Sequence, residues 1–410
     1  MVDVDHALRV SDWAGSGLAY LTGPPESDPD VSRAAVLTEA RRVADDIARL
    51  LGVEVDAATV LAGRAAILGL TRGGRVSAGG ATRLLATADG WCAIALPRAD
   101  DVAALPALLE TDVIPDDPWT AVSGWAAMRS TEAVIARGQL LDIAVAGLGE
   151  VSAEPPVVRR SGRAARARAV DGLLVADLSS LWAGPLCGQL LARAGAVVVK
   201  VESPRRPDGT RSGEPAFFDW MSFGKLSYAV DFDDDTEALR QLLTAADVVI
   251  EGSRPAALRR RGLSADDVPG RPGRIWLRIR GYRGQPYRTA FGDDAAVAGG
   301  LVGVATDGPV FCGDAIADPL TGLTAAVLAA RAPASGALLD VAMSGVVAAT
   351  LDAVPSAAPS PSARRVTSGW VVDTAEGPVP VAWPRRRPVP GKAADPGEHT
   401  AGVLSELRTR

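Results

Sequence analysis

From Gly172 onward, short runs of apolar and β-branched residues alternate with segments of helical pattern. The runs expected as strands are 173–178, 196–201, 226–231, 247–250, 274–279 and 336–341. The helices expected between them cover 183–195, 236–245, 256–261 and 321–332. Short apolar strands separated by helices are typical of a parallel sheet that is buried on both faces. The sequence therefore predicts an α/β fold whose large domain holds a doubly wound, mostly parallel, Rossmann-like sheet.

The first part of the chain has a different pattern. Two apolar runs flank the turn dipeptide Asp89-Gly90 and predict a hairpin over 84–96. Helices are expected at 33–51, 62–70, 100–109 and 130–143, with Asp100 and Ser130 as N-caps of the last two. The predicted domains are a smaller α+β domain over 1–160, a Pro-, Arg- and Ala-rich linker over 151–170, the large domain over 171–355 and an extended C-terminal tail over 356–410.

Composition narrows the class of protein. The chain has 410 residues, a net charge of −6 and 48% hydrophobic residues, which predicts a globular protein without a broad nucleic-acid-binding surface. Its three cysteines lie far apart, so we expect neither a disulfide framework nor a zinc site. No apolar run predicts a transmembrane helix, and the N-terminus lacks the pattern of a secretory signal. We therefore expect a cytoplasmic protein that binds no membrane and no metal.

Histidine is nearly absent. The chain has 2 histidines, His6 and His399, and each lies close to one end of the sequence. This placement argues against a Ser-His-Asp triad, a Cys-His pair or a histidine-ligated metal. The sequence also lacks both common phosphate loops, because Gly224-Lys225 has no upstream glycine and the first strand is not followed by G-x-G-x-x-G. Any chemistry is expected to use carboxylates, hydroxyls, backbone amides or a bound cofactor.

A series of short motifs runs through the large domain in a fixed order. They are Asp177–Pro185, Gly195-Ala196, Lys200–Pro204, Gly224–Ser227, Ala246–Glu251, Asp318–Gly322 and Asp340–Met343. Together they resemble family III CoA-transferases of the CaiB/BaiF type, which include formyl-CoA transferase, carnitine CoA-transferase and α-methylacyl-CoA racemase. Asp89-Gly90-Trp91 resembles a small-domain hairpin that normally follows the sheet domain. The resemblance therefore implies a rearranged or truncated order of domains.

The resemblance makes Asp318 the expected catalytic residue. In the family, the aspartate at this place attacks an acyl-CoA thioester, forms a mixed anhydride and releases CoA thiolate. An enzyme-bound CoA thioester then passes CoA to a carboxylic acid. Covalent catalysis of this kind needs an ionised carboxylate beside donors for the oxyanion. Two alternatives stay open: Asp318 is only a helix N-cap before Pro319, or Asp314 is the nucleophile.

The resemblance also implies a site for CoA, which is expected as a substrate and not as a permanently bound cofactor. The loop after the first strand would contact it, and three cations would bind its phosphates. The expected CoA-binding residues are Ser180, Leu181, Trp182, Ala183, Lys225, Arg260 and Arg280. The partners implied are an acyl-CoA, a carboxylic acid and a second copy of the chain in a homodimer, which in the family is interlinked.

Three other functions are compatible with the sequence. Family members that racemise acyl-CoA use a histidine where this chain has Asp293, and an aspartate is a weaker base. This difference favours the transferase over a racemase or isomerase. The family's usual Asn-aromatic pair beside CoA is replaced by Gly252-Ser253, so a catalytically weak CoA-binding subunit is a second alternative. An unrelated nucleotide-binding protein is the third.

Overall fold

The computed structural model describes residues 4–112, 117–160, 169–252, 255–353, 363–374 and 376–409. Its centre is a seven-stranded sheet with the order β4-β12-β9-β8-β5-β6-β7. These strands are β4 (Val157–Arg160), β5 (Leu174–Asp177), β6 (Val197–Glu202), β7 (Leu226–Ala229), β8 (Val248–Glu251), β9 (Ile275–Arg280) and β12 (Ala337–Ala342). Every pairing except β12 with β4 is parallel. The chain runs outward from β5 to β7 and then returns through β8 to the other side, so the predicted doubly wound fold is confirmed.

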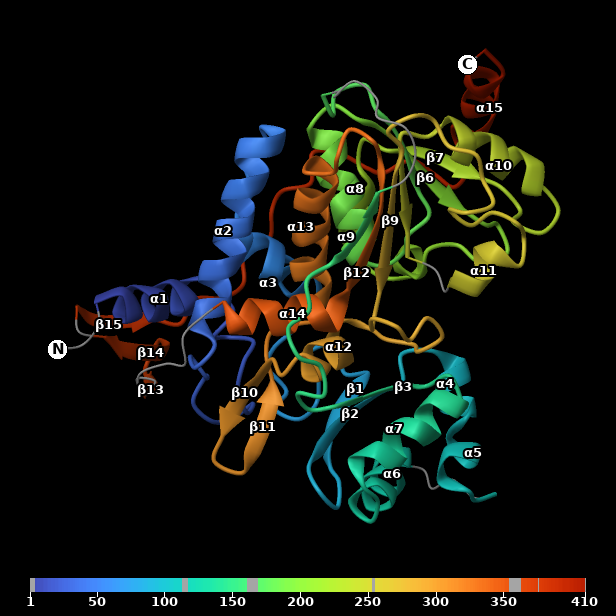
Figure 1. Ribbon diagram of the computed structural model, residues 1–410. Coiled ribbons are helices and arrows are strands. Elements are labelled where there is room, and N and C mark those ends of the chain that lie inside the picture. Colours follow the sequence, from blue (N-terminus) through green and yellow to red (C-terminus); the bar gives the residue numbers. More distant parts are fainter. Residues whose placement is uncertain are drawn as a thin grey trace.

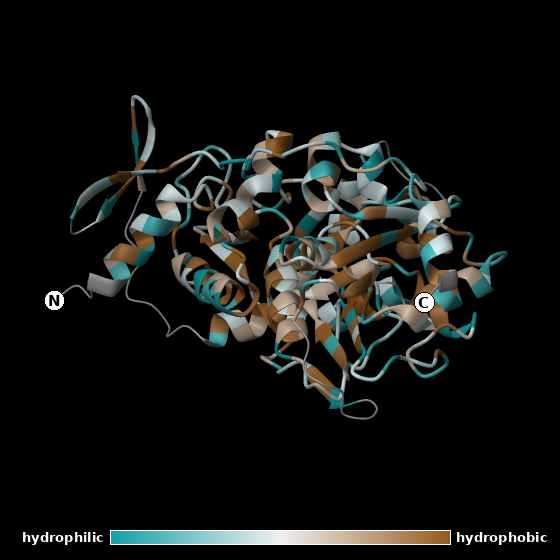
Figure 2. Cartoon of the chain, turned by 90° about the horizontal axis from the view of Figure 1, so that it is seen from above, coloured by the Kyte–Doolittle hydropathy of each residue, from teal (hydrophilic) through white to brown (hydrophobic). Residues whose placement is uncertain are grey.

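Helices cover both faces of this sheet (Figure 1). One face packs against α8 (Ala183–Arg193) and α13 (Ala317–Ala330), and the other against α10 (Thr236–Ala245), α11 (Pro255–Arg259) and α15 (Thr400–Thr409). Alternation along β5 explains this layering, because Val175 belongs to the first core and Leu174 and Ala176 to the second. Figure 2 shows the most hydrophobic residues gathered on the strands between the two helical layers.

The helix that carries Asp318 begins four residues earlier than the sequence predicts. Ala317 is its first residue and Ile316 its N-cap, so Asp318 lies inside the first turn of α13. The alternative in which Asp318 caps the helix, with Pro319 as the first helical residue, is therefore wrong. The adjacent helices are α12 (Gly292–Ala298) and α14 (Met343–Asp352).

The N-terminal helices pack on the large sheet domain. They are α1 (Val4–Gly15), α2 (Ala34–Leu51) and α3 (Ala57–Leu68). Buried residues of all three, such as Trp13, Ile47 and Leu61, share one core with residues of α8 and α13. The predicted range 1–160 for a separate small domain does not match this packing, because the apolar side of α2 is covered by α13.

The smaller α+β unit starts after α3. Its antiparallel sheet contains β1 (Thr82–Ala86), β2 (Trp91–Ala95) and β3 (Ala144–Gly147), so the predicted hairpin is confirmed. Its helices are α4 (Ala99–Ala103), α5 (Leu105–Leu109), α6 (Pro118–Ala127) and α7 (Thr131–Leu140). The Ser130 side chain accepts the Ala133 amide and caps α7 as expected. The helix predicted over 100–109 is divided at Ala104, and Arg98 is the N-cap of α4 in place of Asp100.

The segments predicted as a linker and as an extended tail both contain strands. Within the predicted linker, β4 pairs antiparallel with β12, and its exposed side chains carry no apolar alternation that could have revealed a strand. Residues 161–168 of that linker lie outside the described residues. Within the predicted tail, β13 (Ala363–Val366), β14 (Gly369–Thr374) and β15 (Gly377–Pro380) form an antiparallel sheet. A further hairpin joins β10 (Val302–Ala305) and β11 (Gly308–Phe311).

Candidate active site

The candidate site lies at the carboxyl end of the parallel strands. The chain adds β6 and β7 on one side of β5 and then adds β8 on its other side, so the strand order reverses between β5 and β8. Ligands of doubly wound sheets bind in the crevice at such a switch point. The loop 178–182 follows β5, and the Leu178 amide donates to the Ile250 carbonyl of β8 at 2.9 Å. This loop leads directly into α8, whose first residue is Ala183.

Three helices meet at Asp318. The backbone N–H of Ala183, at the start of α8, hydrogen-bonds to the Asp318 carboxylate. A Cβ atom at Gly292, the first residue of α12, would overlap the Asp318 Oδ2 atom, so only glycine allows this approach. A Cβ atom at Gly322, one turn along α13, would lie 2.7 Å from the Ala183 carbonyl oxygen. The two glycines thus let α12 and α8 close around the carboxylate.

Asp318 is one of three neighbouring carboxylates. Burial raises its pKa to about 7, and the negative charges of Asp293 and Asp314 act in the same direction. The Arg64 guanidinium and the Ala183 amide oppose this rise. Burial likewise raises the pKa of Asp314 to about 6 and raises the pKa of Asp293. Asp318 is partly accessible and near its midpoint at neutral pH, which suits a carboxylate that must react as a nucleophile.

Asp314, the rival nucleophile, is held by an ion pair. Arg64 Nη1 donates to Asp314 Oδ1 at 2.6 Å, and the Asp314 side chain is only 1% exposed. Asp293 accepts the Ala315 amide at 3.0 Å and the Thr82 hydroxyl at 3.2 Å. Asp314 and Asp293 therefore both bind other groups of the protein, and this geometry favours Asp318 as the reactive group.

Sequence reasoning missed Arg64. It projects from α3 of the N-terminal segment, and its guanidinium lies 5.8 Å from the Trp182 ring centroid and 5.7 Å from that of Phe217. The one signal available was its position as the single charged residue of an otherwise apolar helix. Its partner Asp314 is 250 residues away in the sequence, so no local pattern could have joined them.

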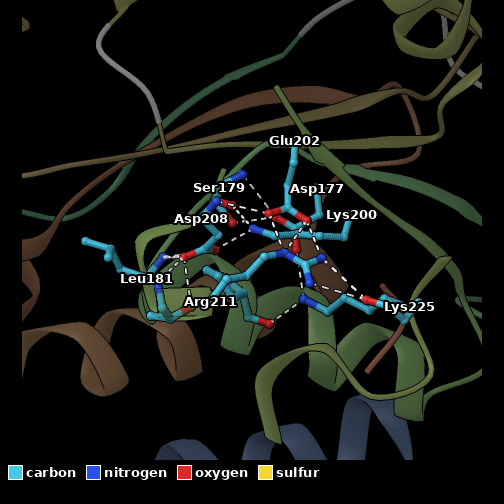
Figure 3. Close-up of polar contacts among 11 residues, drawn as sticks. Asp177, Ser179, Leu181, Lys200, Glu202, Asp208, Arg211 and Lys225 are labelled. Atoms are coloured by element: carbon cyan, nitrogen blue, oxygen red, sulfur yellow. Dashed lines mark hydrogen bonds and ion pairs between the residues drawn. The ribbon is translucent and has the colours of Figure 1, made fainter. Parts of the chain in front are cut away.

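A buried polar network holds the loop 178–182 (Figure 3). Leu181 has a φ of 71°, and both Asp208 carboxylate oxygens accept its amide, at 3.2 and 3.3 Å. Lys200 Nζ pairs with Asp208 Oδ2 at 2.7 Å and also donates to the Ser179 carbonyl. Glu202 accepts the Asp208 amide at 3.0 Å and pairs with Arg211. This network fixes the backbone that carries the Ala183 amide toward Asp318.

Lys225 does not lie where a phosphate could reach it. Its Nζ pairs with Asp177 Oδ2 at 2.8 Å and donates to the Pro185 carbonyl at 2.8 Å. The Lys225 and Asp177 side chains are 1% and 0% exposed. The structure therefore contradicts the expected CoA contact: this lysine neutralises a buried carboxylate beneath α8, which its sequence position could not reveal.

The other two predicted cations lie together in one pocket of about 530 Å³. Arg260 and Arg280 line it with three further arginines and two carboxylates: Arg159, Arg259, Arg278, Asp266 and Asp340. Arg280 pairs with Asp340 at 3.2 Å, while its buried Nε has no hydrogen-bond partner among the described residues. Arg159 comes from β4, the strand that the sequence did not predict. Such a pocket attracts an anionic group.

The four predicted loop residues divide into two pairs. Ser180 is exposed and Leu181 is 40% exposed, so a ligand can reach both. Trp182 and Ala183 are buried, at 2% and 4% exposure. Trp182 packs edge-on against Phe217, with ring centroids 5.4 Å apart, and belongs to the core. Ala183 contributes its backbone amide.

No helix among the described residues combines the length and apolarity that crossing a bilayer requires. In the same part of the chain, no set of three or more His, Cys, Asp or Glu side chains could hold a metal ion. His399 Nδ1 accepts the Ser227 amide at 3.2 Å beside β7.

Comparison with known proteins identifies the large domain. Residues 170–369 match the sequence model of CoA-transferase family III. An acyl-CoA transferase of Fusarium pseudograminearum is 35% identical over 179 residues, covering 38% of this chain and 39% of the relative. A probable fatty acyl-CoA transferase of Mycobacterium tuberculosis is 35% identical over 144 residues, covering 32% and 36%. A succinate–glutarate CoA-transferase of Agrobacterium fabrum is 31% identical over 211 residues, covering 44% and 52%.

A CAIB/BAIF family protein of Brucella suis is a similar solved structure, with 21% identity and a TM-score of 0.49 over 58% of this chain and 99% of that one. The chain spans between 36% and 52% of the length of the three curated relatives named in the preceding paragraph. The matched segment contains Asp318, the loop 178–182 and the arginine-lined pocket apart from Arg159. Residues 170–369 of this chain are therefore similar to CoA-transferase family III.

Proposed function

We propose that this protein transfers CoA from an acyl-CoA thioester to a carboxylic acid, with Asp318 as the nucleophile. The observation that carries the proposal is the position of the Asp318 carboxylate, which is partly accessible, faces the amide at the start of α8 and has a pKa of about 7. A carboxylate with these properties suits nucleophilic attack on a thioester at neutral pH.

The reaction would proceed by exchange of acyl and thiol groups on Asp318. A carboxylate oxygen bonds to the thioester carbonyl carbon, the C–S bond breaks, and CoA thiolate leaves a mixed anhydride. The thiolate then attacks the aspartyl carbonyl and releases the donor acid, which leaves an aspartyl-CoA thioester. The acceptor carboxylate then attacks the aspartyl-CoA thioester and releases CoA thiolate, which leaves a second mixed anhydride. The thiolate attacks the acceptor carbonyl of this anhydride, and the new acyl-CoA and the Asp318 carboxylate are released. No step requires an imidazole.

The surroundings of Asp318 support the charge changes in this scheme. Negative charge develops on the thioester oxygen during attack, and the amides at the start of α8 are suitable donors for it. The pocket with Arg260 and Arg280 would take the CoA phosphates. The loop after β9 connects this pocket with Asp318. It begins after Arg280, contributes Tyr287 to the pocket and ends at Gly292 beside Asp318.

The proposal is tested by trapping the acyl-enzyme. Three similar proteins are named for succinate or succinyl-CoA, so succinyl-CoA is the donor probe. The protein is incubated with succinyl-CoA and hydroxylamine, digested, and the peptide containing Asp318 is examined by mass spectrometry. We expect a hydroxamate on Asp318 and none after Asp318→Asn, while exposed Asp352→Asn serves as the control. Absence of the hydroxamate in the wild-type protein, or its presence on another residue, would overturn the proposal.

The assembly and location stay proposals as well. The family resemblance implies a homodimer in the cytoplasm. Light scattering of the purified protein tests the dimer, and a mass equal to one chain of 42.2 kDa would contradict it.

A further inference from the structure

We propose that Arg64 binds the carboxylate of the acid substrate beside Asp318 and so determines that a carboxylic acid accepts CoA. Its role in transfer rests on the proposed function, whereas carboxylate binding at Arg64 can be measured without turnover. Arg64 lies outside the family domain, in α3 of the N-terminal segment. The site would therefore be completed by a part of the chain that the family match does not cover.

Most N–H donors of the Arg64 guanidinium are available to a ligand. A guanidinium carries five N–H donors in a planar fork. Within the described ranges, Arg64 uses only Nη1, in the bond to Asp314 Oδ1 at 2.6 Å. Its side chain is 25% exposed, so solvent or a small ligand can reach it. The free edge of the fork matches the two oxygens of a carboxylate.

Two aromatic rings hold the guanidinium in place. Trp182 and Phe217 are 2% and 5% exposed and form an edge-to-face pair. Arg64 lies within 5.8 Å of both ring centroids, close enough for cation–π attraction. With Asp314 fixing one end, the side chain is ordered before any ligand arrives, and binding therefore costs little conformational entropy.

Charge balance places the substrate carboxylate at this residue. Asp293, Asp314 and Asp318 each lie within electrostatic range of Arg64. An acid substrate must bring a further negative charge close to Asp318, where like charges repel it. Arg64 is the cation that acts on all three carboxylates, and Asp314 neutralises it only from one side. The opposing interpretation is that Arg64 serves Asp314 alone, and the experiment separates the two.

Propanoate is the probe for binding, because it has one carboxylate and no thioester. Melting temperatures are measured with increasing sodium propanoate at constant ionic strength, with chloride as the replaced anion. The variants are Arg64→Lys, which keeps the charge without the fork, and Arg64→Met/Asp314→Asn, which removes both members of the ion pair. The matched control is Arg364→Met/Asp373→Asn, an exposed Arg–Asp pair on the C-terminal sheet with an N–O distance of 2.8 Å.

We expect propanoate to raise the melting temperature of the wild-type protein and of the control. In both Arg64 variants the apparent affinity should fall by about tenfold or more, the loss typical of a charge-assisted bond. An equal rise in all four proteins, or no rise in the wild-type protein, would overturn the inference.

A second measurement separates this inference from the proposed function. With succinyl-CoA and increasing propanoate, Arg64→Lys should raise the KM for propanoate by about tenfold. The control Arg364→Met/Asp373→Asn should leave both this KM and the yield of Asp318 hydroxamate unchanged. A lower kcat with an unchanged KM would show that Arg64 does not bind the acid. If the wild-type protein forms no hydroxamate, the proposed function fails, and propanoate binding at Arg64 is decided by the melting experiment alone.

Discussion

Asp318 should make the protein less stable as the pH rises, and Asp318→Asn should remove this effect. Burial raises the pKa of Asp318 from 3.8 to about 7 in the folded protein. The folded state therefore binds this proton more tightly than the unfolded state, and stability is lost as the pH rises from about 4 to about 7. A pKa difference of this size corresponds to about 4 kcal/mol, an upper value because the carboxyl is partly accessible.

Urea unfolding at pH 5 and at pH 8 measures the effect. Linkage gives a loss of about 2–3 kcal/mol for wild-type Asp318 between these pH values. Asparagine does not titrate, so the stability of Asp318→Asn relative to the wild-type protein should increase by this amount at pH 8. Asp352→Asn removes an exposed carboxylate and controls for the general change in net charge. A relative stability of Asp318→Asn that is the same at both pH values would refute a buried, proton-binding Asp318 and, with it, the reasoning about its reactivity.

Three further predictions concern Lys225, Leu181 and Arg280. Lys225→Met leaves Asp177 buried without its nearest cation and should cost about 3–5 kcal/mol in urea unfolding, whereas Lys392→Met, in the exposed pair with Asp395, should change little. Leu181→Gly should stabilise the protein by about 1 kcal/mol, because glycine adopts the φ of 71° without strain. A loss of stability would mean that packing of the Leu181 side chain contributes more than the backbone strain costs. Arg280→Gln should weaken CoA binding by calorimetry about tenfold and reduce its dependence on salt, and equal affinity with the control Arg364→Gln would place the phosphates elsewhere.

Local patterns predicted the fold of the large domain well. Strands β5 to β9 are short and buried, so their apolar runs stand out between helices, and α10 coincides with its predicted range. The strand β4 escaped prediction because its four side chains are exposed and its stability comes from backbone pairing with β12. The assignment of α1 to α3 to a small domain failed for a related reason: an amphipathic helix shows that it has a buried face but not which element covers it.

The same limit applies to the site. The family resemblance predicted Asp318, Arg260 and Arg280 as site residues. Lys225 belongs to such a motif too, yet its side chain turns into the core, because Asp177 at the end of β5 needs a cation. Asp208 and Arg64 stand in no recognised motif. Their importance arises from contacts across 27 and 250 residues of sequence, which only the folded chain brings together.

The charges that act on Asp318 come from both halves of the chain. A carboxylate nucleophile must be ionised to attack, but it reacts better when its pKa is close to the working pH. Burial beside two other aspartates would raise the Asp318 pKa further, and Arg64 limits that rise. Arg64 pairs with Asp314, and its charge also lowers the pKa of Asp318 against the effect of burial, which leaves that pKa at about 7. The segment that matches the family model carries Asp318, and α3 of the N-terminal segment carries the cation that lowers the Asp318 pKa against the effect of burial.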